Sequence, residues 1–350
     1  MECRLAHRLA LGRRLRECKN AIAVSVTDEF LRRHPDWITR YGEEHARRHG
    51  VEDAAYHLEF LAAAVDAGSG SAFEEYVRWT AGVLSARGIR VEFLAENLLQ
   101  IEDQLGRALS AADRDDVAGF LAAGLDACKR APTMAAVAAE PSLDGTVQVF
   151  VSALLTGQRA AAVTIAGNAL ARGASAVDLY VDLFQAALHE IGRRWERNEI
   201  SVADEHMATA IVQYVLAQIY ERLPIPAPTK GRLLVAGVGG ELHQLGPNIV
   251  ADVLETHGWD VRFLGTNVPT NGLLSAIEQH HPDVLGLSLT MLTNAAQFRE
   301  TVAAVRARFG DSCPRIVAGG RAFRQARTLW RDCGADAFAT DVRDAVSVLG

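Results

Sequence analysis

A histidine preceded by an acid stands in a glycine-rich stretch in the second half of the chain. Glu241, Leu242 and His243 follow Gly239-Gly240, directly after an apolar run that begins at Leu233. An imidazole coordinates a metal through one ring nitrogen when an acceptor holds the other, and an acid two residues away is a suitable acceptor. The pair predicts a metal ligand with its positioning carboxylate, although an isolated histidine in such a loop is more commonly a surface residue.

The same stretch begins like a dinucleotide-binding fingerprint, with Gly237-Val238-Gly239. The third glycine of that fingerprint is replaced by Leu242, and no acid closes the second predicted strand at Gly265. A Rossmann nicotinamide site is therefore not expected.

Short apolar runs alternate with amphipathic segments from Arg232 onward. The runs are LLVAGV, VRFLG, DVLGLSL, RIVAGG and ADAFAT, and this alternation is typical of a parallel, doubly wound sheet of flavodoxin or Rossmann-like type. Loops that leave the strands of such a sheet share one edge, where ligands bind. The loop of His243 is expected to share that edge with Ser288-Leu289-Thr290 and with Gly319-Gly320.

Together these segments resemble the cobalamin-binding domain family, in which an acid-x-His-x-x-Gly motif is followed by a serine after the third strand and a Gly-Gly pair after the fourth. The resemblance implies that His243 is the lower axial cobalt ligand and displaces the corrinoid's own nucleotide base, whose tail runs into the sheet beside small residues. Two departures, Glu241 for the commoner aspartate and Thr290 for leucine, leave the ligand in place. The implied cofactor-binding residues of this domain are Glu241, His243, Gly246, Ser288, Thr290, Gly319 and Gly320.

A second motif lies upstream, where Trp195 is followed after nine residues by Glu205-His206. This spacing resembles the cap of CarH-type light-sensing cobalamin proteins. The resemblance implies that Trp195 packs on the adenosyl group above cobalt, and that Glu205 and His206 meet its sugar or the upper axial position. The alternative is a core tryptophan and an acid favoured at a helix start.

One departure from the cap motif concerns the light state. DNA-binding CarH-type members carry a histidine directly after the tryptophan, and that histidine binds cobalt in the light, whereas this chain has Glu196. A second axial histidine at that position is therefore excluded. His206 or His189 could take its place, and the sequence leaves the choice open.

The rest of the chain is expected to be helical. Apolar residues recur at three- and four-residue spacing from Ala6 to about Arg130, which favours an all-helical domain. Four further helices, enough for a bundle, are predicted at 143–156, 158–172, 175–196 and 201–222. Three prolines within 223–231 indicate a stiff linker. The expected domains are an all-helical sensor domain, a four-helix-bundle cobalamin cap and a Rossmann-like cobalamin-binding domain, at 1–140, 141–226 and 227–350.

The amino-terminal domain lacks a recognisable DNA reader, whereas CarH-type repressors begin with a winged helix. The architecture instead resembles photocobilins, which bind biliverdin close to cobalamin. Bilins need cations for two propionates, hydrogen-bond partners and flat apolar walls. The candidate bilin-binding residues are Arg33, His34, Trp37, Arg40, Tyr41, His45 and His57. A haem-free globin-like sensor domain is the alternative.

Composition restricts the function classes. Net charge is −7 and no apolar run reaches membrane-span length, which disfavours broad nucleic-acid binding and membrane insertion. The five cysteines are scattered and are expected to be reduced thiols in a cytoplasmic protein.

Three functions fit these observations. The expected one is a photoreceptor in which light cleaves the cobalt–carbon bond of adenosylcobalamin and changes a homo-oligomer or a contact with an unknown signalling partner. The alternatives are a corrinoid methyl carrier of a methyltransferase system and a cobalamin-binding signalling adaptor. An independent enzyme is not expected, because the chain shows no eightfold βα repeat and no nucleophile–base constellation.

Overall fold

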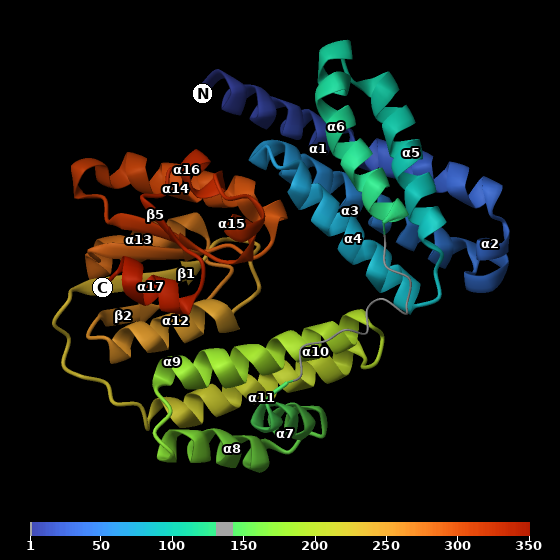
Figure 1. Ribbon diagram of the computed structural model, residues 1–350. Coiled ribbons are helices and arrows are strands. Elements are labelled where there is room, and N and C mark those ends of the chain that lie inside the picture. Colours follow the sequence, from blue (N-terminus) through green and yellow to red (C-terminus); the bar gives the residue numbers. More distant parts are fainter. Residues whose placement is uncertain (1, 131–142) are drawn as a thin grey trace. The chain divides into compact units, whose positions relative to one another are not determined.

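The computed structural model describes residues 2–130 and 143–350. The predicted boundary between residues 140 and 141 lies outside this described part. The chain divides into two compact units (Figure 1): one contains the amino-terminal helices with 291–296 and 325–332, and the other contains the bundle and the rest of the sheet domain. Nowhere in the described ranges does a helix combine the length and hydrophobicity of a membrane span.

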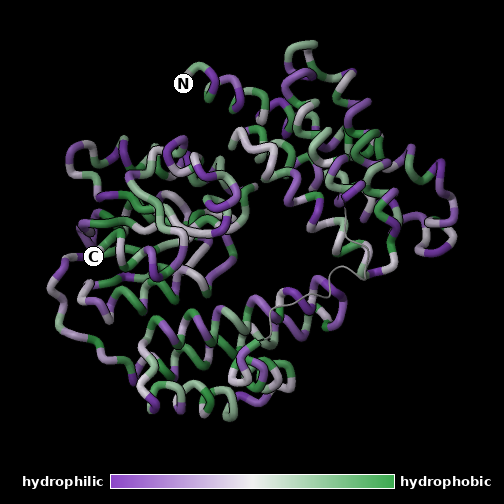
Figure 2. Tube along the Cα trace, in the orientation of Figure 1, coloured by the Kyte–Doolittle hydropathy of each residue, from purple (hydrophilic) through white to green (hydrophobic). Residues whose placement is uncertain are grey.

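The amino-terminal unit is all-helical, as predicted. Its core is formed by fully buried leucines that include Leu15, Leu58, Leu61 and Leu98. Its helices are α1 (Glu2–Arg33), α2 (Asp36–Tyr41), α3 (Glu43–Ala67), α4 (Gly70–Ala86), α5 (Val91–Ala108) and α6 (Ala111–Lys129). Figure 2 shows hydrophobic and hydrophilic residues alternating along such helices, the pattern that an amphipathic helix needs to bury one face.

The predicted bundle is present in the second unit. Its helices are α7 (Gly145–Leu155), α8 (Arg159–Ala171), α9 (Ala176–Asp178), the π-helical turns η2 (Leu179–Gln185), α10 (Ala186–Glu196) and α11 (Val202–Tyr220). Gly157 and Gly173 adopt positive φ at the joints on either side of α8, as expected of residues that end a helix. The π-helical turns interrupt what the sequence predicts as one continuous helix from 175 to 196.

The sheet domain has five parallel strands in the order β2-β1-β3-β4-β5. This is the flavodoxin-like order, so the predicted fold class is confirmed. The strands are β1 (Arg232–Gly237), β2 (Asp260–Phe263), β3 (Val284–Ser288), β4 (Arg315–Gly319) and β5 (Ala337–Ala339). The helices are α12 (Leu245–Thr256), α13 (Thr270–His280), η3 (Leu292–Asn294), α14 (Ala295–Phe309), η4 (Gly310–Ser312), α15 (Arg321–Gln325), α16 (Leu329–Asp332) and α17 (Val342–Val348).

The bundle packs directly against the sheet domain. Ile249 and Val253 of α12 and Val342 of α17 belong to the same hydrophobic core as the bundle helices. Inside this contact the hydroxyl of Tyr180, on η2, donates a 2.8 Å hydrogen bond to Asp252 Oδ2. A buried carboxylate needs such partners, and the contact therefore fixes α12 against the bundle.

Candidate functional site

The loop between β1 and α12 carries the predicted ligand, and neighbouring segments hold it in place. Val238 forms an isolated parallel bridge with Val268. The Gly240 amide donates to Asn267 Oδ1 at 2.8 Å, and the Glu241 amide donates to the Val238 carbonyl at 3.0 Å. These contacts therefore hold the loop that follows β1 in a fixed conformation.

Glu241 is the centre of this loop and is fully buried. Its Oε1 lies 2.5 Å from His243 Nδ1 and accepts a 3.1 Å hydrogen bond from the His243 amide. Its Oε2 accepts a 2.7 Å hydrogen bond from the Thr290 amide, beyond β3. Because a carboxylate only accepts, this pairing assigns the ring proton to Nδ1 and leaves the lone pair on Nε2.

Small residues line the carboxyl edge of the sheet beside this loop. Gly237, Ser288, Gly319 and Ala339 are register partners across β1, β3, β4 and β5. Gly320 has φ +111°, and a Cβ there would lie 2.3 Å from the Leu289 carbonyl oxygen. Only glycine permits this approach of two backbones. The edge is therefore a row without bulky side chains.

These residues fit a corrinoid. Among the described residues, no three His, Cys, Asp or Glu side chains gather to hold a metal ion, but a corrin brings its own equatorial nitrogens and needs one axial imidazole from the protein. The His243 side chain is 54% exposed while its carboxylate partner is buried, so the ring can reach a ligand without losing its support. The row of small residues leaves room for a tail along the sheet.

Gly246 and Thr290 take positions that the motif alone did not specify. Gly246 is the second residue of α12, and a Cβ there would meet nothing within 4 Å. Thr290 acts through its backbone amide on Glu241, so the change from the usual leucine leaves this contact intact. No sequence signal identifies a backbone donor of this kind.

Replacing Glu241 with glutamine tests the support of His243. The side-chain NH2 group of the glutamine would face either the backbone amide of Thr290 or the ring of His243. The donor that it faces would lose its acceptor. We expect a loss of about 1–3 kcal/mol in the free energy of unfolding and about 10–100-fold weaker cobalamin binding. Urea unfolding and titration with hydroxocobalamin measure the two effects. Unchanged affinity would contradict the assigned role.

The cap residues gather at one end of the bundle. Trp195 is partly exposed in the last turn of α10. The carboxylate of Glu190, 3% exposed, pairs with Arg193 at 2.9 Å and Arg194 at 2.7 Å, with Arg197 at 3.7 Å. These arginines flank Trp195 on both sides, and Glu190 therefore fixes the segment that carries it. Glu190 is not among the predicted cap residues, although its three- and four-residue spacing to arginines is a helix-pairing signal.

Glu205 and His206 lie in the first turns of α11. Ser201 and Asp204 form a capping box that starts this helix. Glu205 Oε2 lies 2.5 Å from His206 Nδ1, and Thr209 Oγ1 donates to Glu205 Oε1 at 2.9 Å. The His206 side chain is 75% exposed. The structure thus brings Glu205 and His206 together as a pair.

Six of the seven bilin candidates belong to one region of the amino-terminal unit. His34 and Trp37 both pack against Phe30 and Phe93, and Trp37 also contacts Tyr41. The surrounding candidates make their own contacts there: Arg33 with Glu29 and Glu96, Arg40 over the Tyr41 ring, and His45 with Tyr41. We call the cluster formed by Phe30, His34, Trp37, Tyr41 and Phe93 the aromatic end.

His57 belongs to a different cluster. It is buried on α3, its Nδ1 shares a 2.7 Å hydrogen bond with the Tyr76 hydroxyl, and Phe60 stacks on Tyr76. Burial lowers the pKa of His57 to about 4, which keeps the ring neutral. His57 therefore supplies no positive charge for a propionate, and it lies in another cluster than the other six candidates.

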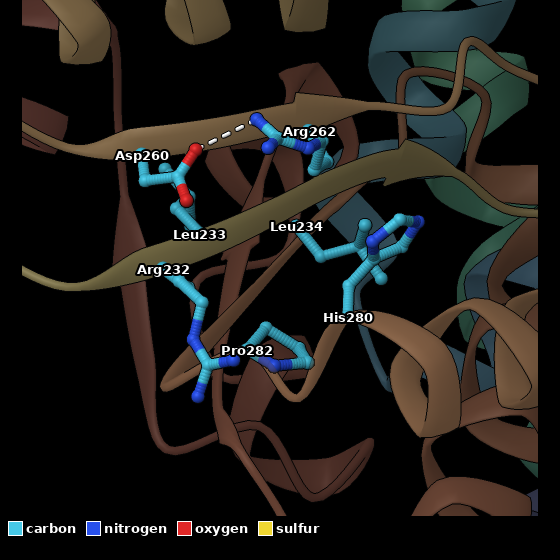
Figure 3. A pocket seen from close by; sticks show the side chains of 7 residues that line it. All are labelled: Arg232, Leu233, Leu234, Asp260, Arg262, His280 and Pro282. Atoms are coloured by element: carbon cyan, nitrogen blue, oxygen red, sulfur yellow. Dashed lines mark hydrogen bonds and ion pairs between the residues drawn. The ribbon is translucent and has the colours of Figure 1, made fainter.

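A small pocket lies at the amino ends of the strands, opposite the carboxyl ends where the His243 loop begins (Figure 3). It is lined by Arg232, Leu233, Leu234, Asp260, Arg262, His280 and Pro282. Arg232 and Asp260 are the first residues of β1 and β2, and Asp260 pairs with Arg262 at 2.6 Å. The pocket is thus at the amino ends of parallel strands, away from the edge where His243 lies.

Comparisons with known families agree with this geometry. Residues 231–349 match the family described as B12 binding domain, and residues 146–220 match a second family with the same description. These two segments are therefore B12-binding domains, and they support a cobalamin cofactor.

Individual relatives match only part of this chain. Dimethylamine corrinoid protein 3 of Methanosarcina acetivorans is 26% identical over 164 residues, 46% of this chain and 76% of that protein. The HTH-type transcriptional repressor CarA of Myxococcus xanthus is 35% identical over 123 residues, 35% of this chain and 41% of the repressor. The structure of the Methanosarcina barkeri monomethylamine corrinoid protein shares the fold, with a TM-score of 0.51 at 19% identity over 57% of this chain and 94% of that one.

Proposed function

We propose that this protein is a cobalamin-dependent photoreceptor, in which light cleaves the cobalt–carbon bond of bound adenosylcobalamin and changes the protein's conformation or oligomeric state. The observation that carries the proposal is the joint presence, in one compact unit, of the His243 loop and a bundle end that holds Trp195, Glu205 and His206. The spacing of those three cap residues resembles that of CarH-type light sensors.

Each part of the unit has a distinct task in this proposal. His243, held by Glu241 through Nδ1, would offer Nε2 as the protein's ligand to the cobalt of a bound cobalamin. The row of small residues from Gly237 to Ala339 admits the nucleotide tail. Trp195, fixed between arginines bound to Glu190, covers the upper group and excludes water. Adenosylcobalamin, when bound, supplies the light-labile bond.

The signal would leave the protein through assembly or through a partner. The chain is proposed to have no enzymatic activity of its own, and its light response is expected to act on a homo-oligomer or an unidentified signalling protein, without direct contact to DNA or membrane. Biliverdin is proposed as a second chromophore at the aromatic end of the first unit, where flat rings lie beside Arg33 and Arg40.

The test is a dark reconstitution of the full chain with adenosylcobalamin and biliverdin. Absorption and size-exclusion profiles are recorded before and after green light. We expect a cobalamin spectral change together with a change in assembly, both absent from His243→Ala, and a red band from bound biliverdin. Trp195→Ala should keep cobalamin yet lose the adenosyl-dependent change in assembly. Tight cobalamin binding with no light-dependent assembly would contradict the photoreceptor.

A corrinoid methyl carrier is the second candidate. The similarity to the dimethylamine corrinoid protein over 76% of that protein's length favours it. Its test is methyl transfer: the chain loaded with methylcobalamin should pass the methyl group to an added methyltransferase and thiol acceptor in the dark. A signalling adaptor would instead bind a partner with cobalamin in place and show neither response.

A further inference from the structure

Two histidines in the second unit share one arrangement. His243 Nδ1 lies 2.5 Å from Glu241 Oε1, and His206 Nδ1 lies 2.5 Å from Glu205 Oε2. In each pair the other carboxylate oxygen accepts a hydrogen bond, at 2.7 Å from the Thr290 amide and at 2.9 Å from the Thr209 hydroxyl. Histidines that ligate a metal usually donate their second ring nitrogen to such a carboxylate.

We infer that His206, held by Glu205, is the upper axial ligand of oxidised cobalt(III) when the only other upper ligand is a solvent molecule. This inference rests on the proposed cobalamin site and deepens it. The His206 Nε2 lone pair forms the bond to cobalt, the solvent ligand leaves, and the Nδ1 proton stays in its hydrogen bond to Glu205. No electron changes hands in this exchange. The result is one imidazole on each face, from His243 below and His206 above.

His206 fits this role better than the other histidine of the cap, His189. The His206 side chain is 75% exposed and presents Nε2 outward, because Glu205 holds Nδ1. The charged side chains that act on His189 are those of Arg193, Arg324 and Arg321. Burial, with these arginines nearby, lowers its pKa, so its surroundings are cationic and unsuited to a further positive metal centre.

The experiment loads the full chain with hydroxocobalamin in the dark, so that no photochemistry is involved. A corrinoid with a solvent ligand changes its absorption spectrum with pH as that ligand loses a proton, whereas one with two imidazoles does not. The wild type should give a spectrum that stays constant with pH and should exchange added azide slowly. His206→Ala should gain the pH-dependent spectrum, exchange azide about tenfold faster or more, and return to the wild-type spectrum with free imidazole.

Two further variants separate a ligand from a structural role. Glu205→Gln should keep the fold and exchange azide faster than the wild type but slower than His206→Ala, because the ligand is present and loses its support. His189→Ala is the matched control and should behave as the wild type. The inference is overturned when His206→Ala matches the wild type, or when His189→Ala produces the change instead.

Failure of the inference and failure of the proposed function give different results. In one outcome, the wild type retains hydroxocobalamin, His243→Ala loses it, and His206→Ala has no effect. This outcome rejects only the role of His206. The light response of the adenosyl form is then judged by its own assay. A constant, His206-dependent spectrum without any light-driven change in assembly supports the ligand and rejects the photoreceptor. Absence of hydroxocobalamin binding in the wild type rejects both.

Discussion

Replacing His243 with alanine is expected to weaken cobalamin binding by at least about 100-fold, because loss of a supporting carboxylate alone costs about 10–100-fold and this change removes the proposed ligand itself. The ring is exposed and its loop is held by backbone contacts of Glu241 and Gly240, so the fold should persist. Titration with hydroxocobalamin, followed by absorption, measures the affinity. Circular dichroism should match that of the wild type.

The control for this variant is His280→Ala. His280 lines the pocket at the amino ends of the strands (Figure 3), at the edge of the sheet opposite His243. Its removal should leave cobalamin affinity unchanged. Equal affinity in His243→Ala and the wild type, or an equal loss in both variants, would place the cofactor elsewhere.

A second large effect is expected at Gly320. A Cβ added there would lie 2.3 Å from the Leu289 carbonyl oxygen and 2.7 Å from its carbon, at φ +111°. These are backbone atoms, and the Leu289 amide also donates a 2.8 Å hydrogen bond to the Gly319 carbonyl. Neither backbone segment can therefore move away from the added methyl group. Gly320→Ala should therefore lower the free energy of unfolding by about 3 kcal/mol, measured by urea denaturation without cofactor.

The neighbouring glycine is the matched control and separates fold from ligand. A Cβ on Gly319 would find its nearest atom, the Ala339 carbonyl oxygen, only at 4.0 Å. Gly319→Ala should cost less than about 1 kcal/mol of stability, yet weaken cobalamin about tenfold, since one methyl group in a filled site costs about 1–3 kcal/mol. Equal stability losses in the two variants would contradict the distinction, and unchanged affinity in Gly319→Ala would argue against a tail beside this residue.

The sheet domain was largely predictable from sequence because its signals are local. Buried parallel strands are short apolar runs, and the runs beginning at Leu233, Val284 and Ile316 lie in β1, β3 and β4. The loops that follow these strands share an edge by topology, so His243, Ser288 and Gly319 could be placed together before any coordinates. The bundle helices followed from apolar spacing and from glycines at their joints.

Other features depend on contacts between distant residues, which a single sequence does not encode legibly. The π-helical turns around Tyr180 have no composition signal, and the hydrogen bond from Tyr180 to Asp252 joins residues 72 positions apart. The Thr290 amide that binds Glu241 is a backbone group, identical in every residue type but proline. The amino-terminal candidates shared composition but not location, because His57 is buried on α3 beside Tyr76 while Trp37 lies at the aromatic end.

The buried carboxylate of Asp252 makes the stability of the contact between bundle and sheet domain depend on pH. Burial raises the pKa of Asp252 from 3.8 to about 6, so the folded protein holds this proton more tightly than the unfolded chain does. The contribution to stability is greatest below pH 3.8 and is lost as pH rises through about 6, an effect of about 3 kcal/mol for a shift of roughly two units. Because Asp252 lies on α12, the helix that begins two residues after His243, proton uptake near pH 6 acts on the same helix that follows the His243 loop.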